Sequence, residues 1–398
     1  MRLPRKIHAH FIYLFILFLP WQTRFILTPL KPEFLSFSIY LSEIFLWLAI
    51  ASRFIDADFK KGVKAQFVFL SFCLLILLGI GWSQDKISVF RLWLYIFDGI
   101  FFYLYLREYG EMRTVAMKLF LFSLFAASLF GIWQFANLGS PALKWLGLAE
   151  RGAWNLGDIV VESGGRFLRA YGPFPHPNIF GGYLAAGIIA LFIFLNIQDV
   201  RRPLRILYAY GAGGILFLAL FLTFSRSAWL ALGVALIYVA AKSQAARKFF
   251  LYFSILAVAL SIIFWPLLGT RVRAEGRLEA KSNTERVASW KEGLGAWIEN
   301  PILGAGAGNN TTVDYGLRIM NYGQVRPAHN IFILILSELG VVGFAICLFL
   351  WKKMWRNSAA RPLLILFFVI GLFDHYLWTL YSGQMLFWAG LAMTADIQ

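Results

Sequence analysis

The chain has 398 residues, of which 60% are hydrophobic and 15% are charged, and its mean hydropathy is +0.67. A soluble domain of this length is nearer half apolar and a quarter charged, so the composition excludes an ordinary soluble enzyme. The net charge of +16 does not indicate nucleic-acid binding, because the basic residues are spread through short loops between apolar runs, as membrane topology signals are. Cys73 and Cys347 lie within apolar runs, so we expect neither a disulfide nor a metal site from them.

Repeated apolar runs of about 20 residues predict an all-α, polytopic membrane protein with about 12 transmembrane helices in a single integral membrane domain, 1–398. The first run resembles a signal peptide but lacks a small-residue cleavage site, so we interpret it as a retained helix, kinked near Pro20 and Arg24. The predicted spans are 8–27, 34–52, 64–82, 88–106, 114–137, 177–197, 204–222, 227–241, 249–268, 329–351, 362–379 and 382–396.

The short loops predict the orientation of the chain. With the N-terminus inside, every inner loop is basic, as in residues 53–64, 201–205 and 352–361. The short outer loops hold few basic residues, such as Arg24 and Lys86. This asymmetry predicts that both termini are cytoplasmic.

Two outer loops are long, 138–176 and 269–328, and loops of this length are usually functional or disordered. In the second, the pattern from Ser282 to Glu285 is a capping box that predicts the start of a helix. Pro301 and Gly304 would end this helix. We expect it to lie flat on the outer membrane surface on an apolar stripe formed by Val287, Trp290, Leu294, Trp297 and Ile298.

His329 and Asn330 stand where loop 269–328 meets a long apolar run. A histidine at the outer end of a helix can stay neutral near pH 7 and accept a proton from a sugar hydroxyl. Glu338 follows on the same predicted helix, where a carboxyl group is costly unless it faces a polar interior. We predict that His329 is catalytic and that Asn330 and Glu338 are candidates for substrate contact. The alternative is an interfacial histidine without a role.

Several arginines cluster on the predicted outer side, and arginine is the residue suited to bidentate phosphate recognition. Contact with lipid headgroups is the alternative for any one of them, but Arg226 lies in a turn too tight to be a general basic patch. We predict that Arg169, Arg226 and Arg286 bind a lipid-linked phosphate or diphosphate. Arg166 and Arg326 are further candidates for substrate contact.

Two more polar groups flank predicted spans. The prolines from Pro173 to Pro177 predict a rigid extended segment before span 177–197, where Asn178 is a candidate helix cap. His176 and Asn178 are possible substrate contacts, with a structural role equally open for His176. The pair Asp374–His375 is interpreted as a proton relay, as a group that orients an arginine, or as a polar pair holding helices together.

Other motifs are excluded. The glycines from Gly304 to Gly308 do not form a dinucleotide-binding loop, because the third glycine is misplaced and no strand precedes them. No outer acidic cluster has metal-ligand spacing, so we expect no divalent metal and no cofactor. Nor is there a serine nucleophile elbow.

Four segments together resemble the superfamily of O-antigen ligases and O-antigen polymerases, which are bacterial envelope glycosyltransferases. RAYGPFPHPNIFGGYLA is similar to the family segment with an arginine, here Arg169, before a Pro-Asn pair. TFSRSAWLAL resembles its Ser-Arg turn, with Arg226. NTERVASWKEGLGAWIENPILGAGAGN resembles its loop helix, with Arg286. His329-Asn330 followed by Gly340 and Gly343 resembles the pattern associated with ligases.

The resemblance implies an all-helical membrane glycosyltransferase with a periplasmic-side cavity, in the bacterial inner membrane. It implies transfer of a glycan from undecaprenyl diphosphate to an acceptor hydroxyl, without nucleotide sugar or metal. We favour an O-antigen ligase whose acceptor is lipid A-core. The main alternative is an O-antigen or exopolysaccharide polymerase using the same donor. A lipid or solute transporter using Asp98, Glu338 and Asp374 is less favoured, because no internal repeat is evident.

Overall fold

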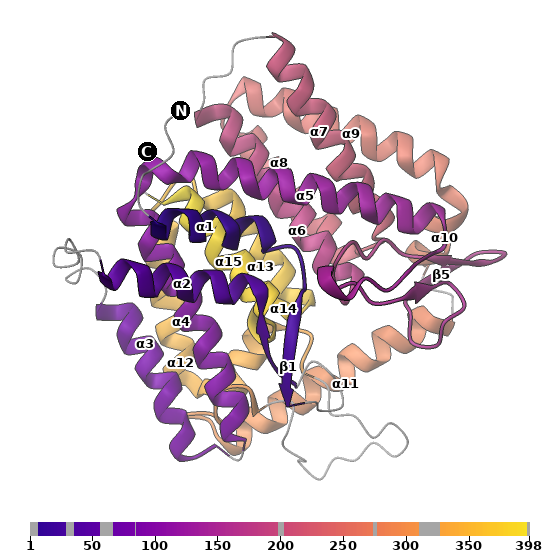
Figure 1. Cartoon of the computed structure of the whole chain (residues 1–398). Helices are drawn as coiled ribbons and strands as arrows, with labels where there is room; N and C mark the ends of the chain where they lie inside the picture. The colour runs from indigo at the N-terminus through magenta and orange to yellow at the C-terminus, as the bar shows by residue number, and fades with distance from the viewer. Residues whose placement is uncertain are drawn as a thin grey trace.

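A computed structural model describes residues 7–28, 36–55, 67–83, 85–197, 203–273, 277–309 and 327–395, and they are mostly helical (Figure 1). The helices are α1 (Ile7–Phe18), α2 (Leu41–Ile55), α3 (Phe67–Leu78), α4 (Lys86–Glu108), α5 (Arg113–Ala136), α6 (Pro177–Ile197), α7 (Pro203–Leu222), α8 (Arg226–Ala240), α9 (Gln244–Ile263), α10 (Trp265–Arg273), α11 (Arg277–Glu299), α12 (Ile331–Trp355), α13 (Arg361–Phe373), α14 (Tyr376–Thr379) and α15 (Tyr381–Thr394).

Three short antiparallel hairpins accompany the helices in the described part of the chain, a departure from the all-α expectation. They pair β1 (Arg24–Thr28) with β2 (Phe37–Tyr40), β3 (Gly139–Ser140) with β4 (Arg151–Gly152), and β5 (Val160–Glu162) with β6 (Arg166–Leu168). The first hairpin shortens two predicted spans. The span expected at 8–27 ends at Phe18, and the one expected at 34–52 begins at Leu41.

Helix starts follow local side-chain chemistry. Asp85 caps α4 by accepting the N–H of Ser88 at 3.0 Å, and Ser243 caps α9 by accepting the N–H of Ala246 at 3.1 Å. Proline occupies the first turn of α6, α7 and α13, where its missing N–H costs nothing. The predicted capping box from Ser282 to Glu285 is wrong as a helix start, because α11 already begins at Arg277.

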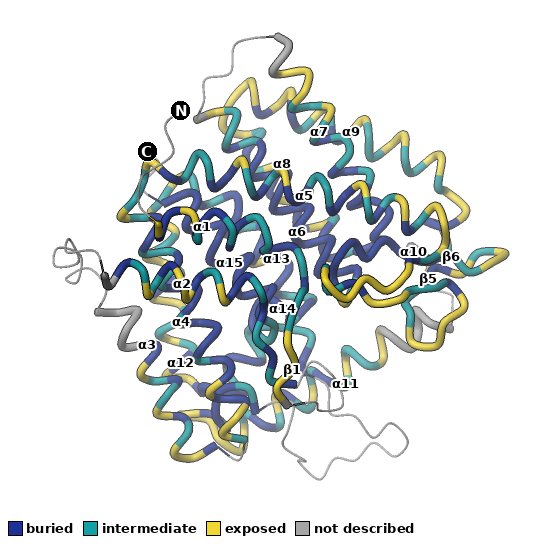
Figure 2. Tube along the Cα trace, viewed as in Figure 1, coloured by how far each residue is buried: buried dark blue, intermediate teal, exposed yellow. Residues whose placement is uncertain are grey.

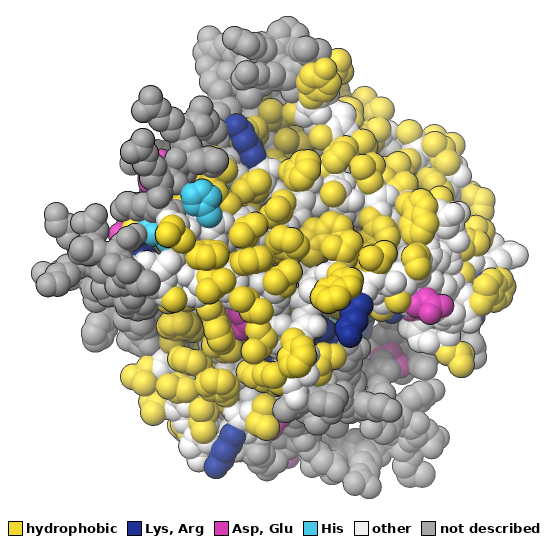
Figure 3. All heavy atoms as spheres, in the orientation of Figure 1, with side chains coloured by type: hydrophobic (Ala, Val, Ile, Leu, Met, Phe, Trp, Pro, Cys, Tyr) yellow, Lys and Arg dark blue, Asp and Glu magenta, His cyan; other side chains and the backbone are white. Residues whose placement is uncertain are grey.

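The helices share one hydrophobic core. Its closest pairings are α1 with α2, α4 with α15, α8 with α13, and α6 with α5, α7 and α8. Figure 2 shows α6, α13 and α15 buried inside, whereas the outer side of α9 is exposed. Leu251, Ile255, Val258 and Ile262 form an exposed apolar stripe along α9, spaced as on one helix face. Much of the surface in Figure 3 is hydrophobic in the same way, as a lipid-facing surface is.

Five helices among the described residues are long and apolar enough to cross a membrane: α4, α5 with its preceding turn, α6, α9 and α12. Shorter apolar helices, including α1, α8 and α13, surround them. The chain is therefore a mostly helical, multi-pass membrane protein. The count of about 12 spans stays a prediction. The span expected at 362–379 is broken, because Asp374 takes up extended backbone after α13 and α14 is a separate short helix.

The two long segments predicted as outer loops meet at one end of the bundle. The hydroxyl of Ser163 donates to the carbonyl of Pro266 at 2.9 Å, which links the β5–β6 hairpin to α10. Figure 1 places α10, α11 and this hairpin on one side, opposite the start of α1 and the end of α15. The face of α11 that packs on the bundle holds Ser289 and Ala296, and the predicted apolar stripe is exposed at Val287, Leu294 and Ile298. Its contact with the membrane surface stays a prediction.

A break in α12 is bridged by the segment after α11. Gly340 has φ +64° within the helix, so the backbone groups around it lose their helical partners. The N–H groups of Ala305 and Gly306 donate to the carbonyls of Ser337 and Glu338 at 2.9 and 3.0 Å. In return, the N–H groups of residues 341 and 342 donate to the carbonyls of residues 301 and 302 at 2.9 and 3.2 Å. Four backbone hydrogen bonds thus tie the end of α11 to α12.

We predict that Gly340→Ala destabilises the protein by about 2 kcal/mol or more, because an added Cβ meets the carbonyl oxygen of Ile302 at 2.2 Å and the positive φ strains any other residue. The measurement is the thermal unfolding midpoint in detergent. Gly233→Ala on α8 is the control, since its Cβ would meet nothing within 4 Å. Equal midpoints for the two variants would contradict the role given to the break.

Candidate functional site

The turn before α8 is strained, and two arginines hold it. Phe224 has φ +48°, which is uncommon for a bulky residue. The Nε of Arg169 donates to the carbonyl of Thr223 at 2.5 Å, and the Nη2 of Arg271 donates to the carbonyl of Phe224 at 2.9 Å. Both side chains are buried. The turn therefore stays in a geometry that presents Arg226 and Ser227 as the first residues of α8.

Arg226 and Ser227 open into a cavity of about 380 Å³ between α8 and α11, which we call the arginine pocket. The Nη2 of Arg226 lies 3.4 Å from the Oδ1 of Asn283. Within the described residues, the guanidinium of Arg286 makes neither a hydrogen bond nor an ion pair. The N-terminus of α8 also favours an anion here. The lining residues are Arg226, Ser227, Leu230, Asn283, Arg286, Val287, Trp290 and Phe373.

The charges around the arginine pocket are mostly of one sign. Burial lowers the pKa of Arg169 to about 10, with smaller contributions from the repulsion of Arg226 and Arg286. Burial, together with repulsion from Arg169, Arg226 and Arg286, lowers the pKa of Arg271 to about 8. Both of these buried guanidiniums stay cationic at neutral pH. This concentration of like charge is costly unless an anion joins it, so the arrangement indicates a binding site for a multiply charged anion.

Asp374 connects the arginine pocket to a histidine. Its Oδ2 accepts the hydroxyl proton of Ser227 at 2.5 Å, and its Oδ1 accepts the amide of Asn178 at 3.1 Å. The Nδ1 of His329 lies 3.9 Å from Oδ1, within ion-pair range when the ring is protonated. His375 packs edge-on against His329, with ring centroids 4.9 Å apart, and its Nδ1 lies 2.7 Å from the hydroxyl of Thr379. Ser227 and Asp374 therefore connect the arginine pocket to the imidazole of His329.

Comparison with known families agrees with this geometry. Residues 211–348 match a family model described as O-antigen ligase. This match supports a relationship to the O-antigen ligase and polymerase superfamily. No curated protein matches the chain. The matched region contains Arg226, Arg271, Arg286 and His329, whereas Asp374 lies outside it.

Members of this family are glycosyltransferase-like enzymes, and the match therefore supports an enzymatic role for this chain. Of the residues predicted to bind diphosphate, Arg226 and Arg286 line the arginine pocket. Arg169 does not, because its guanidinium is 3% exposed and bonds to the protein, including the Oδ1 of Asn178 at 2.7 Å. Arg169 therefore supports the pocket from behind and adds positive charge to it.

The other candidate residues have varied surroundings. The Nδ1 of His176 accepts the N–H of Asn178 at 3.0 Å, and burial, then the Arg169 charge, lowers the pKa of His176 to about 3. Arg166 lies away from the pocket, 3.8 Å from Glu162 and over the ring of Trp154. Arg326 lies outside the described residues.

Asn330, which precedes α12, and Glu338 within it form hydrogen bonds to other groups of the protein. The Oδ1 of Asn330 caps α12 by accepting two backbone N–H groups, and its amide donates to the carbonyl of Leu372 at 3.3 Å. Glu338 is buried and accepts the indole N–H of Trp378 at 2.7 Å. Substrate contact by either residue stays a prediction. The sequence analysis missed Ser227 and Arg271, because nothing in the pattern of loop arginines or of Ser-Arg-Ser shows which side chains face inward.

We predict that Arg286→Gln weakens binding of a lipid-linked diphosphate, with undecaprenyl diphosphate as the probe, about ten- to a hundredfold without lowering the thermal midpoint, because the substitution also removes one of the mutually repelling charges. The loss corresponds to one charge-assisted hydrogen bond of roughly 1.5–3 kcal/mol. Affinity is measured by titrating the lipid into purified protein at fixed ionic strength.

Two control variants distinguish the loss of ligand binding from the loss of structural support for the arginine pocket. Arg273→Gln removes an exposed arginine of α10 that does not line the pocket and leaves both quantities unchanged. Arg169→Gln lowers the thermal midpoint, because the carbonyl of Thr223 loses a buried partner at a cost of about 1–3 kcal/mol. A stable Arg169→Gln protein with the defect of Arg286→Gln would contradict the supporting role.

Proposed function

We propose that this enzyme is an O-antigen ligase of the inner membrane, with both termini cytoplasmic and its site facing the periplasm. It transfers a glycan from undecaprenyl diphosphate to a hydroxyl of lipid A-core, without a metal ion. One observation carries the proposal. Ser227 lines the arginine pocket and donates to Asp374, whose other oxygen lies 3.9 Å from the Nδ1 of His329. A phosphate site and a candidate base are thereby held next to each other.

The arginine pocket takes the diphosphate of the donor. Arg226 and Arg286 contact its oxygens, and the first N–H groups of α8 add donors. As the bond between the sugar C1 and the diphosphate oxygen breaks, negative charge grows on the leaving diphosphate. Arg169 and Arg271, fixed behind the pocket, add positive potential without moving during the reaction. Such preorganised charge stabilises the transition state more than the bound donor.

His329 serves the acceptor. The Asp374 carboxylate lies 3.9 Å from Nδ1 of His329 and faces that edge of the ring, so in the proposed reaction the other nitrogen, Nε2, accepts the proton of the attacking hydroxyl. The acceptor oxygen forms its bond to C1 as the diphosphate leaves from the opposite face, so the anomeric centre inverts. Asp374 is a positioning residue, kept in place by Ser227 and Asn178.

The test uses purified enzyme in detergent with undecaprenyl-diphosphate glycan, with or without lipid A-core, and separates the lipid products on a gel. Glycan on lipid A-core only when that acceptor is present supports the ligase. Longer lipid-linked glycan in both reactions would identify a polymerase instead. We expect EDTA to leave transfer unchanged, since arginines supply the positive charge at the diphosphate.

We predict that His329→Ala lowers the rate of transfer by about 10²–10⁴-fold, the usual contribution of a general base, while the affinity for undecaprenyl diphosphate is retained. Asp374→Asn keeps the shape of the side chain and lowers kcat, with little change in KM for the donor. Product formation is followed over time with saturating donor. A fully active His329→Ala enzyme would refute the assignment.

A further inference from the structure

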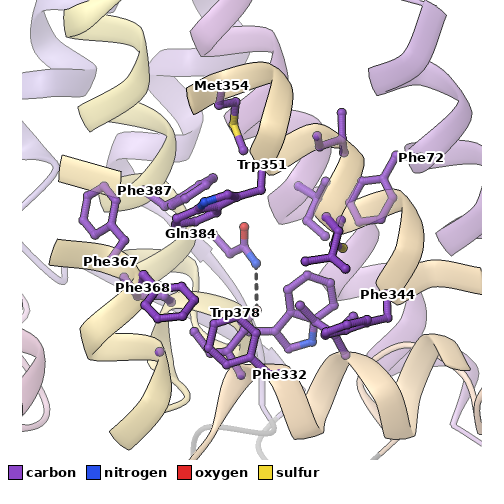
Figure 4. A pocket seen from close by; sticks show the side chains of 18 of the residues that line it. Phe72, Phe332, Phe344, Trp351, Met354, Phe367, Phe368, Trp378, Gln384 and Phe387 are labelled. Carbon is purple, nitrogen blue, oxygen red and sulfur yellow. Dashed lines mark hydrogen bonds between the residues drawn. The ribbon is translucent and has the colours of Figure 1, made fainter. Parts of the chain in front are cut away.

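An apolar crevice of about 160 Å³ lies between α12, α13 and α15, with α3 at one side (Figure 4). We call it the aromatic crevice after six of its lining side chains: Phe332, Phe344, Trp351, Phe368, Trp378 and Phe387. It is distinct from the arginine pocket, and the two cavities share no lining residue among those described.

The aromatic crevice begins beside the candidate base. Ile331 and Phe332, at its near end, directly follow His329 and Asn330. On the other wall, Gly371 precedes Asp374 by three residues. The amide of Asn330 donates to the carbonyl of Leu372 at 3.3 Å and joins the two walls here. A ligand lying in the crevice would therefore have its polar end at His329 and Asp374.

The lining presents hydrocarbon and ring surfaces rather than hydrogen-bonding groups. The indole N–H of Trp378 is used by Glu338 at 2.7 Å. The amide of Gln384 donates to the carbonyl of Trp378 at 2.8 Å, as Figure 4 shows, and accepts the indole N–H of Trp388 at 3.3 Å. Because the wall is almost entirely apolar, and Trp378, Gln384 and Trp388 direct their polar atoms to protein partners, the ligand class is a hydrocarbon chain.

The crevice is lined by both parts of α12 on either side of its break at Gly340. Phe332 and Ile335 come from the first part, and Phe344, Trp351 and Met354 from the second. The floor is buried at Phe367, Leu377 and Trp388, whereas Leu348 and Phe368 at the rim are 52% and 43% exposed. The crevice therefore opens sideways, where lipid surrounds the protein.

The arginine pocket has an apolar side of its own. Leu230 and Val287 line it and are each 49% exposed, so an isoprenoid attached to a diphosphate there continues along α8. The two cavities are connected through Asp374 and His329, because Asp374 accepts a hydrogen bond from Ser227 of the arginine pocket and lies 3.9 Å from His329, two residues before Ile331 of the crevice. We propose that the aromatic crevice binds an acyl chain of the lipid acceptor, which brings the acceptor hydroxyl to His329. This inference rests on the proposed function.

The test fills the crevice with a larger side chain. Cys347→Trp places an indole inside it, and Leu348→Trp covers its exposed rim, where a larger side chain is accommodated without repacking the core. Ile255→Trp, on the exposed stripe of α9, is the matched control. Transfer is measured with lipid A-core and with the same core oligosaccharide after its acyl chains have been removed.

We expect the two crevice variants to raise KM for lipid A-core about tenfold, as loss of a few methylene contacts does. Their KM for the donor and their transfer to the deacylated core stay unchanged, as do all values for Ile255→Trp. A raised KM for the donor alone would overturn the proposal and place the isoprenoid in the crevice. Unchanged kinetics for both crevice variants would also overturn it.

A binding measurement keeps this inference separate from the proposed function. Native mass spectrometry with lipid A-core, without donor, counts the lipid retained by each variant. Retention by the parent and by Ile255→Trp, with loss in both crevice variants, supports the crevice even if the enzyme transfers no glycan to this acceptor. Equal retention by all four proteins overturns the crevice proposal whatever the outcome of the transfer reaction.

Discussion

The arrangement of the candidate site depends on the hydrogen bonds of one buried carboxylate, that of Asp374. It is 3% exposed, and a charge so far from solvent must be compensated by hydrogen bonds and neighbouring cations. Its partners come from α6 through Asn178, from α8 through Ser227 and from the start of α12 through His329. Three helices distant in sequence are therefore held in one arrangement by the solvation needs of a single side chain.

The arginines divide into two groups with different uses. Arg169 and Arg271 give hydrogen bonds to backbone carbonyls of the turn with the left-handed Phe224, whereas Arg226 and Arg286 border an open cavity. The strained turn and the crowded positive charges both oppose folding, and such costs are characteristic of functional sites. An anion in the arginine pocket would offset the charge repulsion, so the folded protein would gain stability when such an anion binds.

The sequence predicted a helical membrane protein and selected the segment around His329 as the candidate site, because both inferences depend on local properties. Apolar runs reveal membrane helices directly, and an arginine-rich loop that ends in His329 stands out against them. The break in α12 and the role of Arg169 were not predictable in this way. Arg169 bonds to Thr223, which lies 54 residues along the chain, and hydropathy says nothing of which carbonyl a guanidinium reaches. The first hairpin was hidden for a similar reason, since its strands are apolar enough to extend the neighbouring spans.

Asp374 is an intermediate case, because its polar character was evident from the sequence and its contacts were not. The pair Asp374–His375 was noticeable as polar residues in an apolar run, and the choice between a relay, an orienting group and a helix tie remained open. The contacts match one of those alternatives, because Asn178 and Ser227 make Asp374 a tie between helices. Its position 3.9 Å from His329 is the basis of a role that was not among them, orienting the imidazole, which stays a proposal.

The four hydrogen bonds across the break in α12 join only main-chain atoms. The side chains of Ile302, Leu303 and Ala305 take no part in them, so many residues would serve equally well there. The glycines are different, because a Cβ added at Gly304 or Gly340 would collide with backbone atoms of the opposite segment. Relatives of this chain can therefore keep the same junction while sharing almost no side chains in it. What identifies the junction is the distance along the chain between its glycines.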